Sequence, residues 1–191
     1  MIESTDAARP CAVLKAEHQV ILRVIEVLKR LVARIDKENT CDLEAMKQCV
    51  TFFRFFADAC HHAKEEDLLF PVLEERGVPR EGGPIGCMLE EHRQARAFTR
   101  EMDEAVQAIE SGRNEALQEF RAAAQRYIDL LTNHIFKEDN VLFMMGDHVM
   151  TGEDQDRLGR QFGEVGCRRF GGKTREELER MAEELEKRWS N

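Results

Sequence analysis

Blocks of basic residues and long apolar runs are both missing from this chain of 191 residues, and each absence excludes a class of protein. With no block of more than two consecutive lysines or arginines and a formal net charge of -9, the chain lacks the basic patch that non-specific nucleic-acid binding requires. No apolar stretch approaches about 20 residues, so we expect no membrane-spanning helix. Residues 1–10 lack the basic start and the apolar stretch of a secretory signal.

Paired cysteine motifs are also absent, although the chain contains six cysteines. None of them forms a C-x-x-C pair, which excludes a zinc ribbon and a thioredoxin-type redox site. Free thiols in a chain without a secretory signal are typical of the cytoplasm, which is the location that we expect. With one tyrosine, one tryptophan and four prolines, the composition favours helices.

Apolar residues recur at helical spacing through four segments of the chain. Their steps alternate between three and four residues, which is the pattern of an amphipathic helix. Each segment places one histidine inside its apolar stripe. The four stripes are Leu14, His18, Ile21, Ile25, Leu28, Val32 and Ile35; Leu43, Met46, Val50, Phe53, Ala57, His61, Glu65 and Leu68; Ile85, Met88, His92, Ala95, Thr99, Met102, Val106 and Ile109; and Leu117, Phe120, Ala124, Tyr127, Leu131, His134, Glu138, Val141 and Met145. The second helix should close near Pro71, the third near Ser111 and the fourth at Gly146.

Four long helices with short connections predict an all-α protein with an up-down-up-down four-helix bundle. Residues 10–148 should form this bundle as one domain. Beyond it, several glycines should break the chain into short pieces, and residues 149–191 should form a helical C-terminal extension outside the bundle. One further helix is expected from Thr174 to about Trp189, because Thr174 and Glu177 have the spacing of a capping box.

Six ionisable side chains interrupt the apolar stripes, and together they predict a metal site. A buried imidazole or carboxylate is costly without a partner, and a metal ion supplies one. Two helices carry a glutamate four residues after the histidine, which places each pair on one helix face about 6 Å apart. The predicted metal ligands are His18, His61, Glu65, His92, His134 and Glu138.

The two histidine–glutamate pairs belong to an internal repeat, in which residues 61–70 align without gaps on residues 134–143. The alignment places His62 opposite Ile135, so we expect His62 to lie on a mostly polar helix face, outside the ligand set. Glu66 falls opposite Asp139. Both of these carboxylates are expected next to the ligands or in solvent.

The donor set favours iron or manganese over calcium or magnesium, which prefer oxygen ligands alone. Zinc is chemically possible, but about six ligands exceed the four that a tetrahedral zinc takes. Two carboxylates on separate helices can bridge two metals. Together with a bridging oxide or hydroxide and four imidazoles, they would leave about two of twelve octahedral positions open to small ligands.

Four pieces of the sequence resemble the haemerythrin-like family of HHE cation-binding domains, over about residues 12–145. The pieces are Glu17-His18, residues 60–71 with the pattern H-x-x-x-E-E-x-x-L-F-P, residues 88–92, and H-x-x-x-E-D-x-x-L-F from His134. The resemblance implies a di-iron centre with an oxo or hydroxo bridge in a four-helix bundle. It also implies that the six predicted ligands are the matching iron ligands.

The chain differs from the oxygen-carrying branch of that family at two places. Carriers have two histidines one turn apart on the third helix, whereas the neighbours of His92 at that distance are Met88 and Arg96. Carriers also use an aspartate five residues after the last histidine, a position that Asp139 holds here beside Glu138. Reversible oxygen carriage is therefore not expected.

The resemblance instead implies the bacterial members associated with sensing, iron handling or nitrosative and oxidative stress. Two functions stay open on this basis. One is a module that binds or senses oxygen, nitric oxide or peroxide. The other is a di-iron enzyme that turns over peroxide or nitric oxide, or a protein that handles iron or repairs iron centres.

Overall fold

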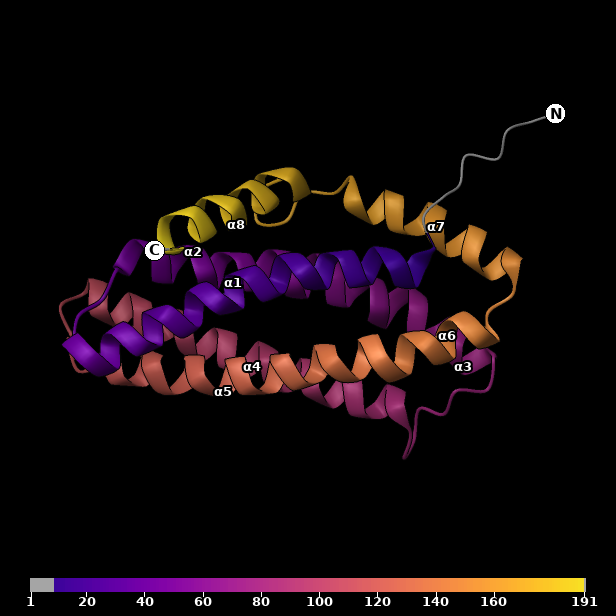
Figure 1. Cartoon of the computed structure of the whole chain (residues 1–191), viewed down its shortest axis with the longest axis horizontal. Coiled ribbons are helices and arrows are strands. Elements are labelled where there is room, and N and C mark those ends of the chain that lie inside the picture. The colour runs from indigo at the N-terminus through magenta and orange to yellow at the C-terminus, as the bar shows by residue number, and fades with distance from the viewer. Residues whose placement is uncertain (1–8, 191) are drawn as a thin grey trace.

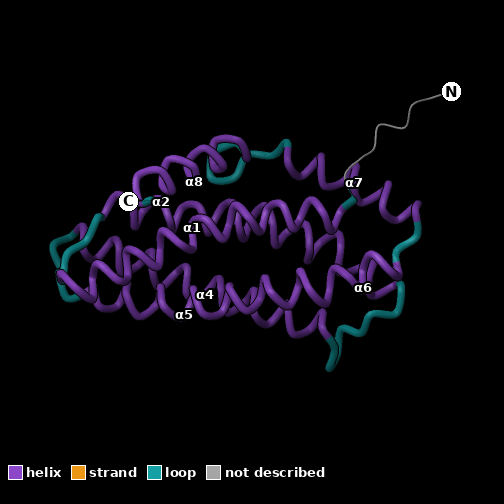
Figure 2. The backbone as a smooth tube through the Cα atoms, viewed as in Figure 1, coloured by secondary structure: helices purple, strands orange, loops and turns teal. Residues whose placement is uncertain are grey.

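The computed structural model describes residues 9–190, and helices joined by short loops make up nearly all of this range (Figure 2). The described residues form no β-strand, only one isolated bridge between Phe170 and Lys173. The all-α prediction is therefore confirmed. The prediction that residues 1–10 lack a secretory signal falls mostly on residues 1–8, which lie outside the described range.

Four long helical rods form the bundle and alternate in direction, as the sequence predicted (Figure 1). Two of the rods are interrupted by π-helical segments, written η. The first rod is α1 (Pro10–Glu38); the second runs through α2 (Leu43–Phe52), η1 (Phe53–His62), η2 (Glu65–Leu69) and α3 (Phe70–Glu75); the third is α4 (Pro84–Glu110); and the fourth runs through α5 (Ala116–Lys137), η3 (Glu138–Leu142) and α6 (Phe143–Val149).

The apolar stripes of the four rods meet inside the bundle and form two hydrophobic clusters. Along α1, Leu14 belongs to the smaller cluster and Ile21 to the larger one, and His18 lies between them. Met88 and Ala95 flank His92 on α4 in the same way. The polar residues of the stripes therefore form a layer between two apolar regions.

The π-helical segments shift the buried face of a rod by one residue. Val141 and Met145 were predicted to lie in the core, but they are 50% and 37% exposed, while Leu142 and Phe143 are buried. The reason is η3, because its i→i+5 hydrogen bonds place an additional residue in the turn. In the second rod, which continues past Pro71 to Glu75, the same shift buries Leu69.

The C-terminal extension contains two helices, α7 (Gly152–Gly166) and α8 (Arg175–Trp189). The prediction that glycines break the first part into short pieces is wrong. A capping box of Thr151 and Asp154 starts α7, and its buried apolar face offsets the weak helix propensity of glycine, about 1 kcal/mol each. Helix α8 begins after Thr174, and the predicted capping box with Glu177 is present.

Both helices of the extension pack on the bundle from outside. Helix α8 packs on α1 and α2, and α7 packs on α1 (Figure 1). We propose that residues 10–148 form the bundle domain and that residues 149–191 form an extension outside it.

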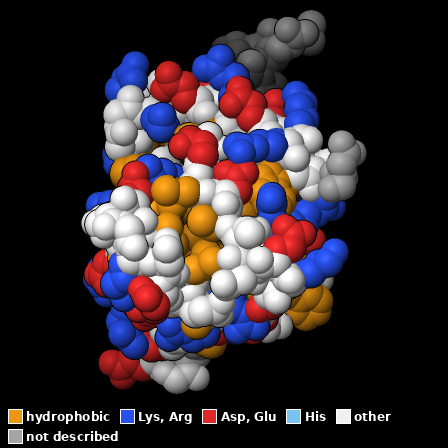
Figure 3. Space-filling view, turned by 90° about the vertical axis from the view of Figure 1, so that its left-hand side faces the viewer, with side chains coloured by type: hydrophobic (Ala, Val, Ile, Leu, Met, Phe, Trp, Pro, Cys, Tyr) orange, Lys and Arg blue, Asp and Glu red, His pale blue; other side chains and the backbone are white. Residues whose placement is uncertain are grey.

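The surface at the end of the bundle shown in Figure 3 carries acidic and basic side chains in mixture, with a few apolar side chains between them. Neither sign of charge forms a broad patch on that face. Among residues 9–190, no helix has both the length and the apolar composition needed to cross a bilayer.

Candidate metal centre

Two overlapping groups of four side chains lie in the polar layer, and each could hold a metal ion. Within each group, one potential ligand atom per residue lies within 4.8 Å of the others. Glu65 belongs to both groups, and every member is at most 2% exposed. The first group is His18, His61, Glu65 and Glu138, and the second is His62, Glu65, His92 and His134. The structure thus brings all six predicted ligands together and adds His62.

The two glutamates stand between histidines of different groups. Each carboxylate is fully buried and approaches the Nε2 atoms of two imidazoles. The distances are 3.2 Å from Glu138 Oε2 to both His18 Nε2 and His134 Nε2, 3.3 Å from Glu65 Oε1 to His61 Nε2, and 3.5 Å from Glu65 Oε2 to His92 Nε2. This placement suits carboxylates that bridge two metals.

A ring of carboxylates holds the outer nitrogen, Nδ1, of four imidazoles. Each of these carboxylates is the sequence neighbour of a residue in the cluster, and each contacts the histidine of the next rod in chain order. The contacts are Glu17 to His61 at 3.0 Å, Glu66 to His92 at 2.7 Å, Glu91 to His134 at 2.9 Å and Asp139 to His18 at 2.8 Å. The last contact returns to the first rod, so the ring is closed.

Three cationic side chains support this ring from outside. Lys64 donates to Glu17, Lys137 donates to Glu91, and Arg96 donates to Glu66 at 2.8 Å. Carboxylates of this kind fix the orientation of a metal-binding imidazole and keep its proton on Nδ1. The lone pair of Nε2 then faces the interior.

Apart from the contacts between the glutamate oxygens and the Nε2 atoms given above, the described chain offers the inward-facing atoms no partner. Both carboxylate oxygens of Glu65 and of Glu138, and the Nε2 atoms of His18 and His61, are buried without a hydrogen bond. The Nε2 atoms of His92 and His134 lie 3.0 Å apart, with both Nδ1 atoms at carboxylates. Buried polar atoms without partners cost about 1–3 kcal/mol each, and charged ones cost more. A metal cation fits this set, because it would pair with all of these atoms at once.

Protonated imidazoles balance the two buried carboxylates in the absence of a metal. Burial lowers the pKa of His61, but Glu65 and Glu17 outweigh it and raise that pKa to about 10. Burial likewise opposes the effect of Glu138 on His134, whose pKa is raised to about 9. For Glu65, burial and the neighbouring Glu138 raise the pKa.

We expect metal binding to strengthen as the pH rises from about 6 to 9. The raised pKa values of His61 and His134 mean that both rings keep their protons through this range in the metal-free protein. Because an imidazole must offer a free nitrogen to a metal, binding has to release these protons.

Anaerobic titration with ferrous iron in weakly buffered solution, followed with a pH indicator, measures the protons released. The exposed His148 supplies the control, since His148→Ala should release as many protons as the wild type. Metal binding without proton release near pH 7 would contradict this account.

His62 was predicted to lie on a polar face, and that prediction is wrong. Its side chain is 3% exposed, and its ring stacks on that of His92 with 3.8 Å between centroids. The cause is η1, whose i→i+5 turns rotate the chain less per residue than an α-helix, so that His61 and His62 both face inward. Burial lowers the pKa of His62 to about 4, although Asp58 lies 3.5 Å from its Nδ1 atom. His62 is therefore neutral and able to bind a metal.

The outer carboxylates were only partly anticipated from the sequence. Glu66 and Asp139 lie next to the cluster, which was one of the two places expected for them. The roles of Glu17 and Glu91 were missed, although both directly precede a cluster histidine in the sequence. The signal available in the sequence was an acidic residue adjacent to four of the six candidate ligands. Arg96, one turn after His92, pairs with Glu66 and with Asp58, the latter at 3.0 Å.

Comparison with known proteins supports a metal-binding assignment. A family model described as "Hemerythrin HHE cation binding domain" matches residues 9–146. Two curated relatives, named only as uncharacterized proteins of Mycobacterium bovis and Mycobacterium tuberculosis, are each 23% identical over 158 residues. Each alignment covers 83% of this chain and 61% of the relative, so the chain spans about three fifths of the relatives' length.

Proposed function

Because the chain belongs to the haemerythrin family of HHE cation-binding domains, we propose that it holds a pair of iron ions and binds one small ligand there. The observation that carries this proposal is the double cluster of inward-facing imidazoles around Glu65 and Glu138. The family and the structure both indicate a helical bundle that binds metal. The identity of the metal and of the ligand is our inference.

Seven side chains would hold the two irons. His18 and His61 would serve one iron, His62, His92 and His134 would serve the other, and Glu65 and Glu138 would bridge the two. Five imidazoles, two bridging carboxylates and one bridging oxide or hydroxide fill about eleven of twelve octahedral positions. With this ligand set, the iron held by His18 and His61 would keep one position open.

An iron pair would supply redox chemistry and a site for oxygen, nitric oxide or peroxide. The residues of the chain prepare this site. The carboxylate ring keeps the imidazoles oriented, and the ring of Phe143 stacks on His18 with centroids 5.5 Å apart. The apolar clusters on both sides of the polar layer exclude water, which favours a small neutral ligand over an ion.

The number of open coordination positions decides whether reversible oxygen binding is expected. Four imidazoles would leave both irons open, which favours oxidation, whereas a fifth imidazole from His62 leaves only one iron open. The positions of Met88 and Arg96 therefore do not by themselves argue against reversible binding.

A polar cavity near His62 favours a second candidate, an enzyme that turns over peroxide. The cavity measures about 480 Å³ and is lined by Asp58, Arg96 and Thr99 among others. Asp58 and Arg96 form an ion pair there, and Asp58 also contacts His62. A charged pocket of this kind suits a polar substrate better than an apolar gas. This candidate requires the open position to lie on the side of His62 instead of the side of His18 and His61.

We expect the anaerobic ferrous protein to bind one nitric oxide per two irons, because one coordination position is open. Titration with a nitric oxide donor, followed by visible and electron paramagnetic resonance spectra, measures this ratio. The metal-free chain is the control and should give no signal. A ratio of two would refute the proposed five-imidazole ligand set.

Gas cycling separates the two candidate functions. A binding module exposed to oxygen and then stripped under argon should return to its ferrous spectrum. An enzyme should instead consume hydrogen peroxide well beyond one equivalent per iron pair. Ferric protein that accumulates without turnover would indicate sensing through oxidation.

A further inference from the structure

The C-terminal extension reaches the carboxylate ring at Glu17. This carboxylate accepts a hydrogen bond from His61 Nδ1 at 3.0 Å and another from Lys64 Nζ. Arg175, at the start of α8, places its Nε atom 3.6 Å from Glu17 Oε1. Glu17 and Lys64 are each 1% exposed, so charges near them are only weakly screened by solvent.

The turn that leads into α8 contacts the helical segment that carries His61 and His62. Gly171 has a left-handed backbone with φ of 57°, and a Cβ atom there would lie 2.3 Å from Cζ of Phe55. Phe55 belongs to η1. The close fit leaves no room for a side chain at residue 171, so the turn is seated directly on η1.

The two helices of the extension also shield the charges around Glu17. A half-open pocket of about 490 Å³ lies where the two helices meet, lined by Lys64, Arg175 and Cys167 together with glycines of α7. Lys64 is buried beneath this junction rather than open to bulk water. Looser packing of the extension would hydrate the contact between Lys64 and Glu17 and weaken it.

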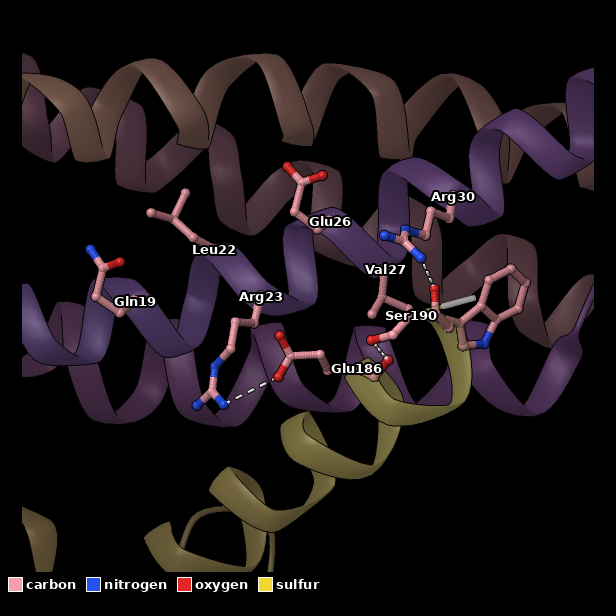
Figure 4. Close-up of a pocket in the computed structure, with 9 residues that line it drawn as sticks. Gln19, Leu22, Arg23, Glu26, Val27, Arg30, Glu186 and Ser190 are labelled. Carbon is pink, nitrogen blue, oxygen red and sulfur yellow. Dashed lines mark hydrogen bonds and ion pairs between the residues drawn. The ribbon is translucent and has the colours of Figure 1, made fainter.

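The far end of α8 is anchored separately on α1, as Figure 4 shows. Arg23 of α1 pairs with Glu186 of α8 at 3.3 Å, and Arg30 donates to the carbonyl oxygen of Trp189. Residues 186–190 and α1 line a shallow groove of about 260 Å³ there. These contacts hold α8 on α1. Glu179 pairs with Arg175 Nη2 at 2.9 Å, and the Nε atom of Arg175 faces Glu17.

We propose that the extension positions the metal-binding histidines from outside the bundle, with Arg175 as a positioning residue that acts on His61 through Glu17. This inference rests on the proposed iron site. Without the positive charge of Arg175, Glu17 is held less firmly and is less neutralised. His61 would then be oriented less strictly, so iron would leave faster. Its imidazole would also donate more electron density, which would favour the ferric state.

The test compares Arg175→Gln with Arg175→Lys and with Arg180→Gln. Arg180 is an exposed residue of the same helix and supplies the matched control. Release of ferrous iron to a chelator is measured under argon, together with the midpoint potential and the thermal unfolding of the metal-free forms. Loss of an outer partner of a metal-bound imidazole weakens metal binding about 10- to 100-fold.

We expect Arg175→Gln to release iron about three- to tenfold faster than the wild type. This effect is smaller than the roughly 10- to 100-fold loss given above, because Arg175 acts on His61 only through Glu17. Its midpoint potential should fall, and Arg175→Lys should recover most of both changes. Arg180→Gln should match the wild type. If the wild type holds two irons but Arg175→Gln and Arg180→Gln behave alike, the inference is wrong while the iron site stands. A wild type without bound iron would refute the proposed function itself.

Discussion

Loading with ferrous iron is expected to raise the thermal unfolding midpoint of the wild type strongly, and Glu65→Gln should lose most of that increase. A ligand at 1,000 times its dissociation constant stabilises a protein by about 4 kcal/mol per site. At about 2–4 °C per kcal/mol for a chain of this size, one occupied site corresponds to roughly 8–16 °C. An amide in place of Glu65 has no negative charge and bridges two metals poorly, so both sites should weaken.

Calorimetry of the metal-free and iron-loaded forms measures this difference, and elemental analysis gives the iron content. Glu75→Gln is the matched control, because Glu75 lies exposed in the same rod and contacts no cluster residue. It should keep two irons and the full shift. If Glu65→Gln retained two irons per chain, Glu65 would not be a bridging ligand. One zinc per chain in the wild type after reconstitution with ferrous iron would refute the iron pair.

His62→Ala is expected to weaken binding of one iron at least about 10-fold, the lower limit observed for loss of an outer-shell partner. The sequence repeat alone predicts a much smaller effect, since it aligns His62 with Ile135. The structure leads to the opposite expectation because His62 joins His92 and His134 in one buried group. His61→Ala should be comparable in size, because His61 holds the same place in the other group.

The nitric oxide ratio gives this variant a second readout. At iron concentrations that keep both sites of His62→Ala filled, the missing imidazole should leave a second position open. Two nitric oxide molecules per iron pair are then expected instead of one. His148→Ala, which changes an exposed histidine, should keep the wild-type ratio and affinity. An unchanged ratio together with unchanged iron binding in His62→Ala would exclude His62 from the ligand set.

Helical periodicity was sufficient to predict the four rods and the six side chains first assigned to the site. Every residue of the first stripe, from Leu14 to Ile35, is buried as predicted. The repeat was informative as well, since η2 begins at Glu65 and η3 at Glu138, the two aligned glutamates. Apolar spacing predicts these helices because the residues that recur at helical spacing are the ones buried in the core.

The π-helical turns could not be predicted from the sequence, and they caused the main errors in the predicted positions of side chains. An α-helical wheel assigns each residue 100°, so one additional residue in a turn changes every assignment after it. Val141, Met145 and His62 were misplaced for this reason. The segment η1 has no counterpart before His134, where α5 stays α-helical. The two halves of the repeat therefore differ in backbone geometry before their aligned histidines, which the sequence alignment alone does not show.

The closed carboxylate ring also has a consequence for biosynthesis. Its last contact joins His18 to Asp139, residues separated by 121 positions in the chain. At a translation rate of about 5–20 residues per second, roughly 6–24 s pass between the synthesis of these two residues. A nascent chain that has emerged only as far as the third rod has no His134, Glu138 or Asp139. If the bundle binds iron as proposed, the complete ligand set is available only after the fourth rod has been synthesised.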